Sequence, residues 1–378
     1  MRLGRIGILL AALAIAASGL VVFLTDDRER HQTPAATASE TADWLAALAQ
    51  APVDGLGRPR EAWELSLPED HAPHPQARSE AWLLTAHLQD EAGSFAAVQF
   101  ALLRIGLMAP DKPPSGAGWE GREIYRGHVV LLDSAGHRAM AEERIRRGMP
   151  GVAGLDPNGP ALRLDDWAIA FGTDGGQWQL RAGAGDASAE LALIPLHPAN
   201  SADAAEAPFR GYGFSRMQAE GTLNLGGQAQ GLSGTAWFEH LWGDLPLPDG
   251  GPIASDRLIL HLDDGSDLSV TRSRRAAGRG SATVEAFIAG AGADAGAIGT
   301  DAAEMEPLRH WQGRHANWPV AWTLRLDDLL LAVTPVAEDQ EHDFIAPVWS
   351  GLVRAEGQRG GRRITATGTL QLTGYADP

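Results

Sequence analysis

The chain has 378 residues, of which 44% are apolar and 21% charged, and its formal net charge is −17. This length predicts two domains or one large β domain. The acidic charge and the single lysine, Lys112, exclude a protein that binds nucleic acid through its phosphates. The lack of cysteine excludes thiol catalysis, thiolate-bound zinc, iron–sulfur clusters and disulfides.

The N-terminus has the pattern of a targeting or anchoring segment. Arg2 and Arg5 precede an uncharged stretch from Ile6 to Leu24. Its length fits a short spanning helix, and its small residues also fit the cleavage site of a signal peptide. We therefore expect residues 1–24 to form an apolar helix that is a signal peptide or an inner-membrane anchor. Both alternatives place the body outside the cytoplasm, as an exported, periplasmic or extracytoplasmic protein.

Residues 25–54 predict a polar tether followed by a short helix. The stretch before Ser39 is rich in Pro, Ala and Thr, which is typical of a linker. Ser39 is placed to cap a helix that carries Trp44 and ends before Pro52.

The rest of the chain predicts short strands joined by turns. Its 45 glycines and 23 prolines favour an all-β fold over a helical bundle. Residues 365–375 alternate in polarity, and Leu258–Leu262 lead into a turn at Asp263–Gly265. A further strand is expected at Thr283–Ala289, within a region rich in glycine and alanine.

Three short signatures occur twice in the same order. The pairs are Asp70-His71 with Glu239-His240, residues 87–90 with 261–264, and residues 162–166 with 324–328. Their nearly constant offset predicts two similar antiparallel β domains, at residues 55–205 and 206–378.

Two clusters combine histidine, an acid and tryptophan. The first contains Asp70, His71, His74, Glu80 and Trp82, and the second contains Trp237, Glu239, His240 and Trp242. A carboxyl group beside tryptophan in an apolar pocket has a raised pKa and can donate a proton near neutrality. Indole faces stabilise a developing cation. These groups suit protonation of an alkene and capture of the carbocation by water.

The first cluster has simpler interpretations as well. His71 and His74 could bind a metal with Asp70, but their spacing fixes no third ligand, so we predict no metal and no cofactor. The same side chains could instead tie a loop to a strand by hydrogen bonds. Most of the 12 tryptophans are expected to pack the cores.

From about Leu67 to Tyr375 the chain resembles the family of carotenoid 1,2-hydratase (hydroxyneurosporene synthase) and AttH proteins. The matching segments are residues 68–74, Glu80-Ala81-Trp82, 85–88, 125–128, Asp165-Asp166-Trp167, 234–237, 262–265, Asp339-Gln340-Glu341 and 372–375. The chain departs from the family pattern at four places: Ala81 replaces a tryptophan, Glu239 an aspartate, Leu241 an acid, and Trp349-Ser350-Gly351 an aromatic-Glu-Gly motif.

The resemblance implies two lipocalin-like antiparallel β-barrel or sandwich domains. It implies a protein that binds a lipophilic ligand, an isoprenoid or a lipid, as accessory to an ABC transporter permease. One alternative is a carotenoid 1,2-hydratase-like lyase that adds water to an isoprenoid double bond. Another is a non-enzymatic periplasmic scaffold.

The enzyme alternative assigns roles to particular residues. The expected catalytic residues are Asp70, His71, Glu239 and His240, with either acid as the proton donor and a histidine orienting it. The expected ligand-binding residues are His74, Glu80, Trp82, Trp237, Trp242 and Glu341, where Trp237 and Trp242 would stabilise the cation.

Overall fold

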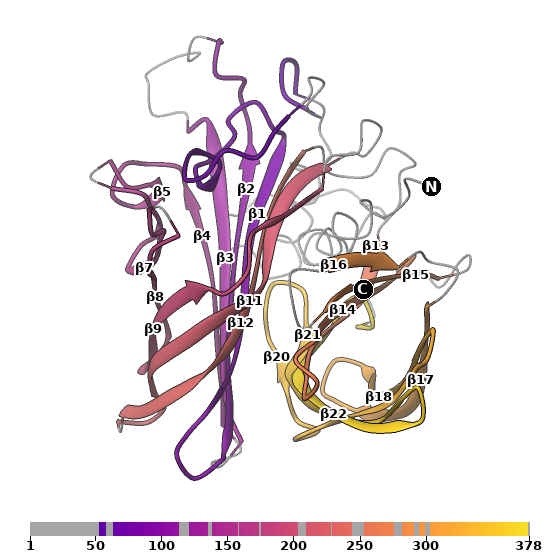
Figure 1. Ribbon diagram of the computed structural model, residues 1–378. Helices are drawn as coiled ribbons and strands as arrows, with labels where there is room; N and C mark the ends of the chain where they lie inside the picture. The colour runs from indigo at the N-terminus through magenta and orange to yellow at the C-terminus, as the bar shows by residue number, and fades with distance from the viewer. Residues whose placement is uncertain are drawn as a thin grey trace, which may run out of the picture.

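The computed structural model is shown in Figure 1. It describes residues 53–57, 63–112, 121–134, 138–157, 159–173, 175–202, 209–227, 229–243, 253–275, 282–290, 295–298 and 303–376. The regular elements of these ranges are strands, apart from one 3₁₀ helix, η1 (Glu69–His71), so the predicted all-β class is confirmed. The predicted N-terminal apolar helix and the helix after Ser39 lie outside the described residues. Within the described ranges, no helix has the length and apolar character to cross a membrane.

The first sheet contains twelve antiparallel strands. In chain order they are β1 (Ser79–Gln89), β2 (Phe95–Gly106), β3 (Glu123–Asp133), β4 (Arg138–Arg147), β5 (Ala153–Leu155), β6 (Ala161–Leu164), β7 (Trp167–Ala170), β8 (Trp178–Ala184), β9 (Ala187–Pro195), β10 (Asn200–Ala202), β11 (Phe209–Asn224) and β12 (Ala229–Gly243). The order across the sheet is β4-β3-β2-β1-β12-β11-β9-β8-β7-β6-β5, with β10 on β11. This sheet therefore extends to Gly243, past the boundary expected at residue 205.

The second sheet contains ten antiparallel strands. In chain order they are β13 (Ile253–Leu262), β14 (Asp267–Arg275), β15 (Thr283–Ala289), β16 (Ala295–Ile298), β17 (Ala303–Gln312), β18 (Asn317–Leu326), β19 (Leu329–Pro335), β20 (Glu341–His342), β21 (Val348–Arg359) and β22 (Arg362–Leu372). The order is β16-β15-β14-β13-β22-β21-β19-β18-β17, with β20 on β21. The strands predicted at 258–262 and 283–289 are confirmed, as is most of that at 365–375.

The two sheets follow the same path. In each, four strands form a meander, and the last strand of the unit pairs with the first, β12 with β1 and β22 with β13. The repeated His87 and His261 signatures are equivalent, because each ends the first strand of its sheet. The other two repeats are not equivalent in structure. His71 lies in η1, whereas His240 lies in a strand. The two Asp-Asp turns connect β6 with β7 and β18 with β19, which occupy different places in the two strand orders.

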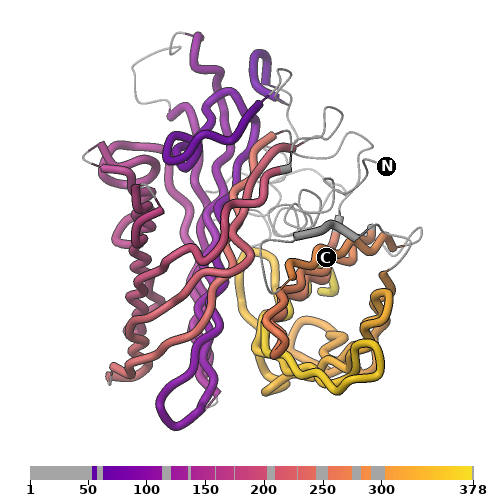
Figure 2. The backbone as a smooth tube through the Cα atoms, viewed as in Figure 1, coloured from indigo at the N-terminus to yellow at the C-terminus, as the bar shows by residue number. Residues whose placement is uncertain are grey.

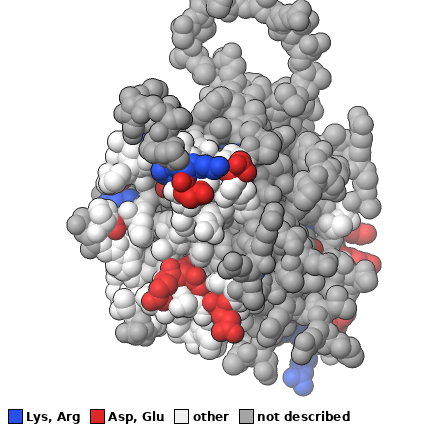
Figure 3. Space-filling model, turned by 90° about the horizontal axis from the view of Figure 1, so that it is seen from above, with Lys and Arg blue, Asp and Glu red and all other residues white. Residues whose placement is uncertain are grey.

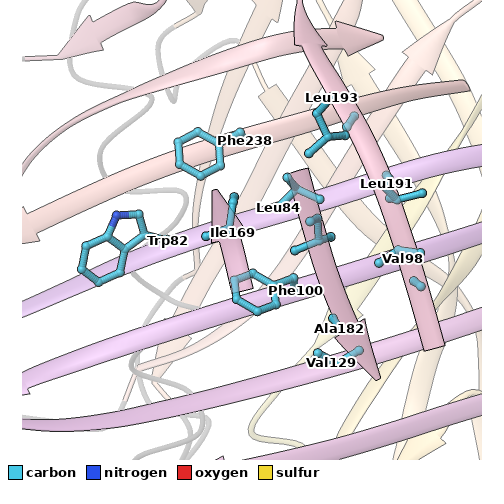
Figure 4. Close-up of a cluster of buried hydrophobic side chains, with 14 of the residues drawn as sticks. Trp82, Leu84, Val98, Phe100, Val129, Ile169, Ala182, Leu191, Leu193 and Phe238 are labelled. Atoms are coloured by element: carbon cyan, nitrogen blue, oxygen red, sulfur yellow. The ribbon is translucent and has the colours of Figure 1, made fainter. Parts of the chain in front are cut away.

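Burial distinguishes the two halves of the first sheet. Strands β8 and β9 alternate between buried and exposed residues, as expected when one face contacts solvent. Strands β1, β2 and β3 are buried on both faces. Their inner face packs the core shown in Figure 4, which includes Trp82, Phe100 and Phe238. Their outer face packs against the second sheet, which lies beside them in Figures 1 and 2.

Polar contacts join the two sheets. His87 Nε2 lies 3.2 Å from Thr369 Oγ1, and Gln99 Oε1 accepts from Ser350 Oγ at 2.5 Å. The charged groups on the described part of the face seen in Figure 3 are mainly acidic, in keeping with the net charge of −17.

Candidate functional site

The inner face of the first sheet carries a polar cluster at one end of its apolar core. Strand alternation puts Glu80 and Trp82 of β1 on this face, together with His240 and Trp242 of β12. The register pairs Trp82 with His240 and Glu80 with Trp242. Residues far apart in the sequence therefore meet because β1 and β12 are neighbours.

The segment around η1 brings further groups to the cluster. The Asp70 carboxylate accepts from Ser66 N at 2.7 Å and from Trp63 Nε1 at 3.1 Å. The backbone oxygen of Asp70 lies 2.9 Å from His240 Nδ1. His74 follows at the edge of the cluster, where its side chain is 24% exposed.

Glu80 is the centre of the cluster and is buried. Its Oε1 lies 2.7 Å from His74 Nδ1 and 2.8 Å from His240 Nε2, and its Oε2 accepts from Arg104 Nε at 2.8 Å. Burial alone would raise the pKa of Glu80, but Arg104 and the two imidazoles hold it well below its ordinary value. Glu80 is therefore an ionised carboxylate.

The partners of the two imidazoles fix where their protons lie. His240 Nδ1 faces a carbonyl oxygen, which only accepts, and its Nε2 faces Glu80. His74 faces the carboxylates of Glu80 and Asp70, the latter at 3.2 Å from Nε2. All four ring nitrogens therefore face acceptor oxygens. Burial lowers the pKa of His240, against the opposing effect of Glu80, so the proton between this pair is more acidic than that of an exposed imidazolium.

His71 and Tyr212 form a neutral pair beside these charges. His71 Nδ1 contacts the Tyr212 hydroxyl, and the His71 ring stacks on Phe171 at 4.4 Å between centroids. Burial, reinforced by His240, lowers the pKa of His71 to about 3, and burial raises the pKa of Tyr212. Both side chains are uncharged at neutral pH.

Indole rings form two walls of the cluster. Trp242 stacks on His74 at 3.8 Å with an interplanar angle of 3°, and Trp82 stacks on His240 at 4.5 Å. Such faces attract a cation. The arrangement combines acidic protons, carboxylates and π faces in one place.

Trp237 and Glu239 lie on the opposite face of β12, toward the second sheet. Glu239 Oε2 accepts from Arg257 Nη2 at 2.5 Å, and its Oε1 accepts from Trp237 Nε1 at 2.8 Å. The structure therefore does not bring Glu239 together with Asp70 or His71. Both oxygens of Glu239 therefore accept hydrogen bonds from fixed partners between the sheets.

Glu341 lies in the second sheet, away from the inner cluster. It accepts from His315 N and from Trp318 Nε1, each at 2.9 Å. Gly313 lies in this turn, and a Cβ there would stand 2.6 Å from Glu341 Oε2. The close approach of Glu341 therefore needs a residue without a side chain at this position. Glu341 therefore ties a turn to the sheet.

Arg104 and Tyr212 also contact the cluster and were not predicted from the sequence. Arg104 is an isolated charge within the apolar run of β2, a pattern that signals a buried ion pair. Tyr212 is one of three tyrosines, and nothing in its neighbourhood marks it. The metal set considered from the sequence is not assembled, because His71 contacts Tyr212. Among described residues, the donor atoms of His74, Glu80 and His240 lie within 4.8 Å of one another.

Comparisons with known proteins agree on the family. The sequence profile of the AttH-like family matches residues 58–375, so the chain belongs to this family. An AttH-type protein of Nitrosomonas europaea shares the fold with a TM-score of 0.70 and 24% identity, over 82% of this chain and 97% of the other. Among curated proteins no match is found.

Two solved structures carry functional names. Kievitone hydratase from Nectria haematococca superposes with a TM-score of 0.62 and 13% identity, over 85% of this chain and 98% of the other. CghA, in complex with Sch210972, superposes with a TM-score of 0.51 and 13% identity, over 81% of this chain and 94% of the other. At these identities the comparison establishes the lipocalin-like fold alone.

Proposed function

We propose that the protein is a hydratase that adds water to a carbon–carbon double bond of an apolar, isoprenoid-like substrate. The observation that carries this proposal is the inner cluster, in which Glu80 and Asp70 share protons with His74 and His240 beside Trp242. The fold shared with a protein named as a hydratase supports the class of reaction.

The chemistry needs one acid, a water molecule and a place for positive charge. His74 lies at the exposed edge with both ring nitrogens on carboxylate oxygens, so it is the group placed to give a proton to one alkene carbon. The electron pair of the double bond forms the new C–H bond, and the cation on the other carbon lies against the Trp242 face. Water adds to that carbon, and its extra proton returns to His74. The substrate gains one water and the protein is unchanged.

The test uses the full chain in detergent with acyclic isoprenoid alkenes, analysed by mass spectrometry. The proposal expects a product heavier by one water, a loss of at least about 100-fold in turnover for His74→Gln, and no change for His315→Gln. His315 is the matched control because its Nε2 also contacts a carboxylate, Asp343, at 2.7 Å, outside the cluster. Equal turnover in both variants would reject His74 as the acid.

A second candidate is a carrier of a lipophilic ligand, which would enter at a small cleft between the sheets. The cleft has a volume of about 30 Å³, so the sheets must separate to admit a lipid. Its lining is mainly apolar, with Arg126, His128, Gln371 and Thr373 as the polar groups. An apolar wall with a few polar groups is typical of ligand sites. An unmodified lipid that co-purifies with the full chain, and is lost on Ala101→Trp, would support the carrier over the hydratase.

We also propose that the protein works outside the cytoplasm, with an ABC transporter permease as its partner. The support is the sequence of residues 1–24, in which Arg2 and Arg5 precede an uncharged stretch. Fractionation of cells expressing the full chain, with cross-linking to membrane proteins, tests both parts. Recovery of the chain from the cytoplasm would reject them.

A further inference from the structure

We propose that His74, Glu80 and His240 form a binding site for one divalent metal ion of the zinc class. This inference goes beyond the hydratase proposal, because it concerns a second state of the same cluster, in which His74 binds an ion in place of donating a proton.

The donor atoms already converge. His74 Nδ1 and His240 Nε2 lie 2.7 and 2.8 Å from the same oxygen of Glu80. Zinc–nitrogen bonds of about 2.0–2.1 Å in tetrahedral geometry place donor atoms roughly 3.4 Å apart. Each imidazole therefore needs to move only about 0.6 Å away from the Glu80 oxygen to admit an ion, and all three donor atoms lie within 4.8 Å of one another.

Each ligand also has the outer contacts that metal ligands need. Metal-bound histidines donate their other ring N–H to a carboxylate or a backbone carbonyl, which fixes the tautomer and the ring. His74 Nε2 lies 3.2 Å from the Asp70 carboxylate, and His240 Nδ1 lies 2.9 Å from the Asp70 backbone oxygen. The second oxygen of Glu80 accepts from Arg104 Nε. One residue, Asp70, thus orients both histidines toward Glu80.

The donor set selects the class of ion. Two imidazole nitrogens and one carboxylate oxygen suit zinc and its first-row neighbours, whereas magnesium and calcium prefer oxygen ligands. The His74 side chain is 24% exposed and provides the entry side. Three protein ligands leave a fourth position for water.

The experiment is isothermal titration calorimetry of the metal-stripped full chain with ZnCl₂. We expect one ion per chain. His74→Gln should abolish the binding, and Asp70→Asn, which retains all three ligands, should weaken it about 10–100-fold. His315→Gln should bind as the parent does.

Each outcome decides for or against the site. The visible spectrum of bound Co²⁺ should show nitrogen ligation in the parent and lose it in His74→Gln. No zinc binding by the parent, or unchanged binding by both His74→Gln and Asp70→Asn, would overturn the proposal. Circular dichroism checks that each variant is folded, and because His74 is partly exposed its substitution leaves the core intact. Zinc binding by a parent protein that shows no turnover in its metal-free state would reject the hydratase and not the metal site.

Discussion

The two faces of the β1–β12 pair place buried carboxylates in two different environments, Glu239 of β12 on the outer face and Glu80 of β1 on the inner face. On the outer face, Glu239 contacts Arg257 and Trp237, so one fixed cation balances one anion. Across the strand, His240 and Glu80 contact each other and His74, whose protons can leave. The pair on the outer face is suited to holding two sheets together, and the inner cluster is suited to transferring protons.

The comparison shows that tryptophan beside a buried acid does not by itself make a proton donor. Glu239 has the indole N–H of Trp237 at 2.8 Å, but its other oxygen is held by Arg257 at 2.5 Å. The cationic partner decides the chemistry. Arginine does not titrate at physiological pH, whereas imidazole does.

The largest expected effect comes from breaking the outer pair. Arg257→Met should lower the free energy of unfolding by about 3–5 kcal/mol, because Glu239 is then a buried charge without its cation. The double variant Glu239→Leu/Arg257→Met should recover most of this loss. Urea unfolding of the three proteins provides the measurement, and equal losses in the single and double variants would contradict the account.

A third carboxylate, Glu285 of β15, sharpens the comparison because it is partly buried and its Oε2 has no hydrogen-bond partner among the described residues. Burial raises its pKa to about 7. The pKa of Glu285 is therefore higher in the folded protein than in the unfolded chain. The contribution of this group to stability is largest below about pH 4.5 and is lost as the pH rises through 7.

Glu285→Gln should therefore stabilise the protein above pH 7, by about 1–2 kcal/mol after allowance for partial exposure, and have little effect at pH 4.5. The exposed Glu304→Gln serves as the control. Denaturant midpoints at pH 4.5 and pH 8 measure the difference, and a gain of equal size at both values would show that Glu285 does not titrate in this way.

The smallest expected effect concerns the neutral pair of the inner face. Tyr212→Phe removes the hydroxyl that contacts His71 and changes little else in shape. We expect a loss of about 0.5–1.5 kcal/mol in the free energy of unfolding, typical of one hydrogen bond. A thermal denaturation series would detect it. A loss comparable to that of Arg257→Met would mean that the pair carries charge.

Local patterns predicted the parts of the fold that depend on neighbours along the chain. The strands at Leu258–Leu262 and Thr283–Ala289 followed from alternation and turn residues. Alternation also puts Glu80 and Trp82 on one face, and it separates Glu239 from His240. Glu239 and His240 were nevertheless predicted to act in one cluster, whereas the structure places them on opposite faces of β12.

Contacts between distant strands could not be predicted in this way. Glu80 meets His240 only because β12 pairs with β1, and no local signal encodes that register. The same holds for Tyr212, which reaches His71 through β11, and for Arg257, which reaches Glu239 across the two sheets. The site therefore depends on the sheet order.

The most direct test of the central claim, that the inner cluster transfers protons and the outer pair does not, is turnover of an acyclic isoprenoid alkene by the full chain in D₂O. The account predicts one new carbon–deuterium bond per added water, lost in His74→Gln and retained in Glu239→Gln. Deuterium incorporation that survives His74→Gln, or that disappears only in Glu239→Gln, would contradict it.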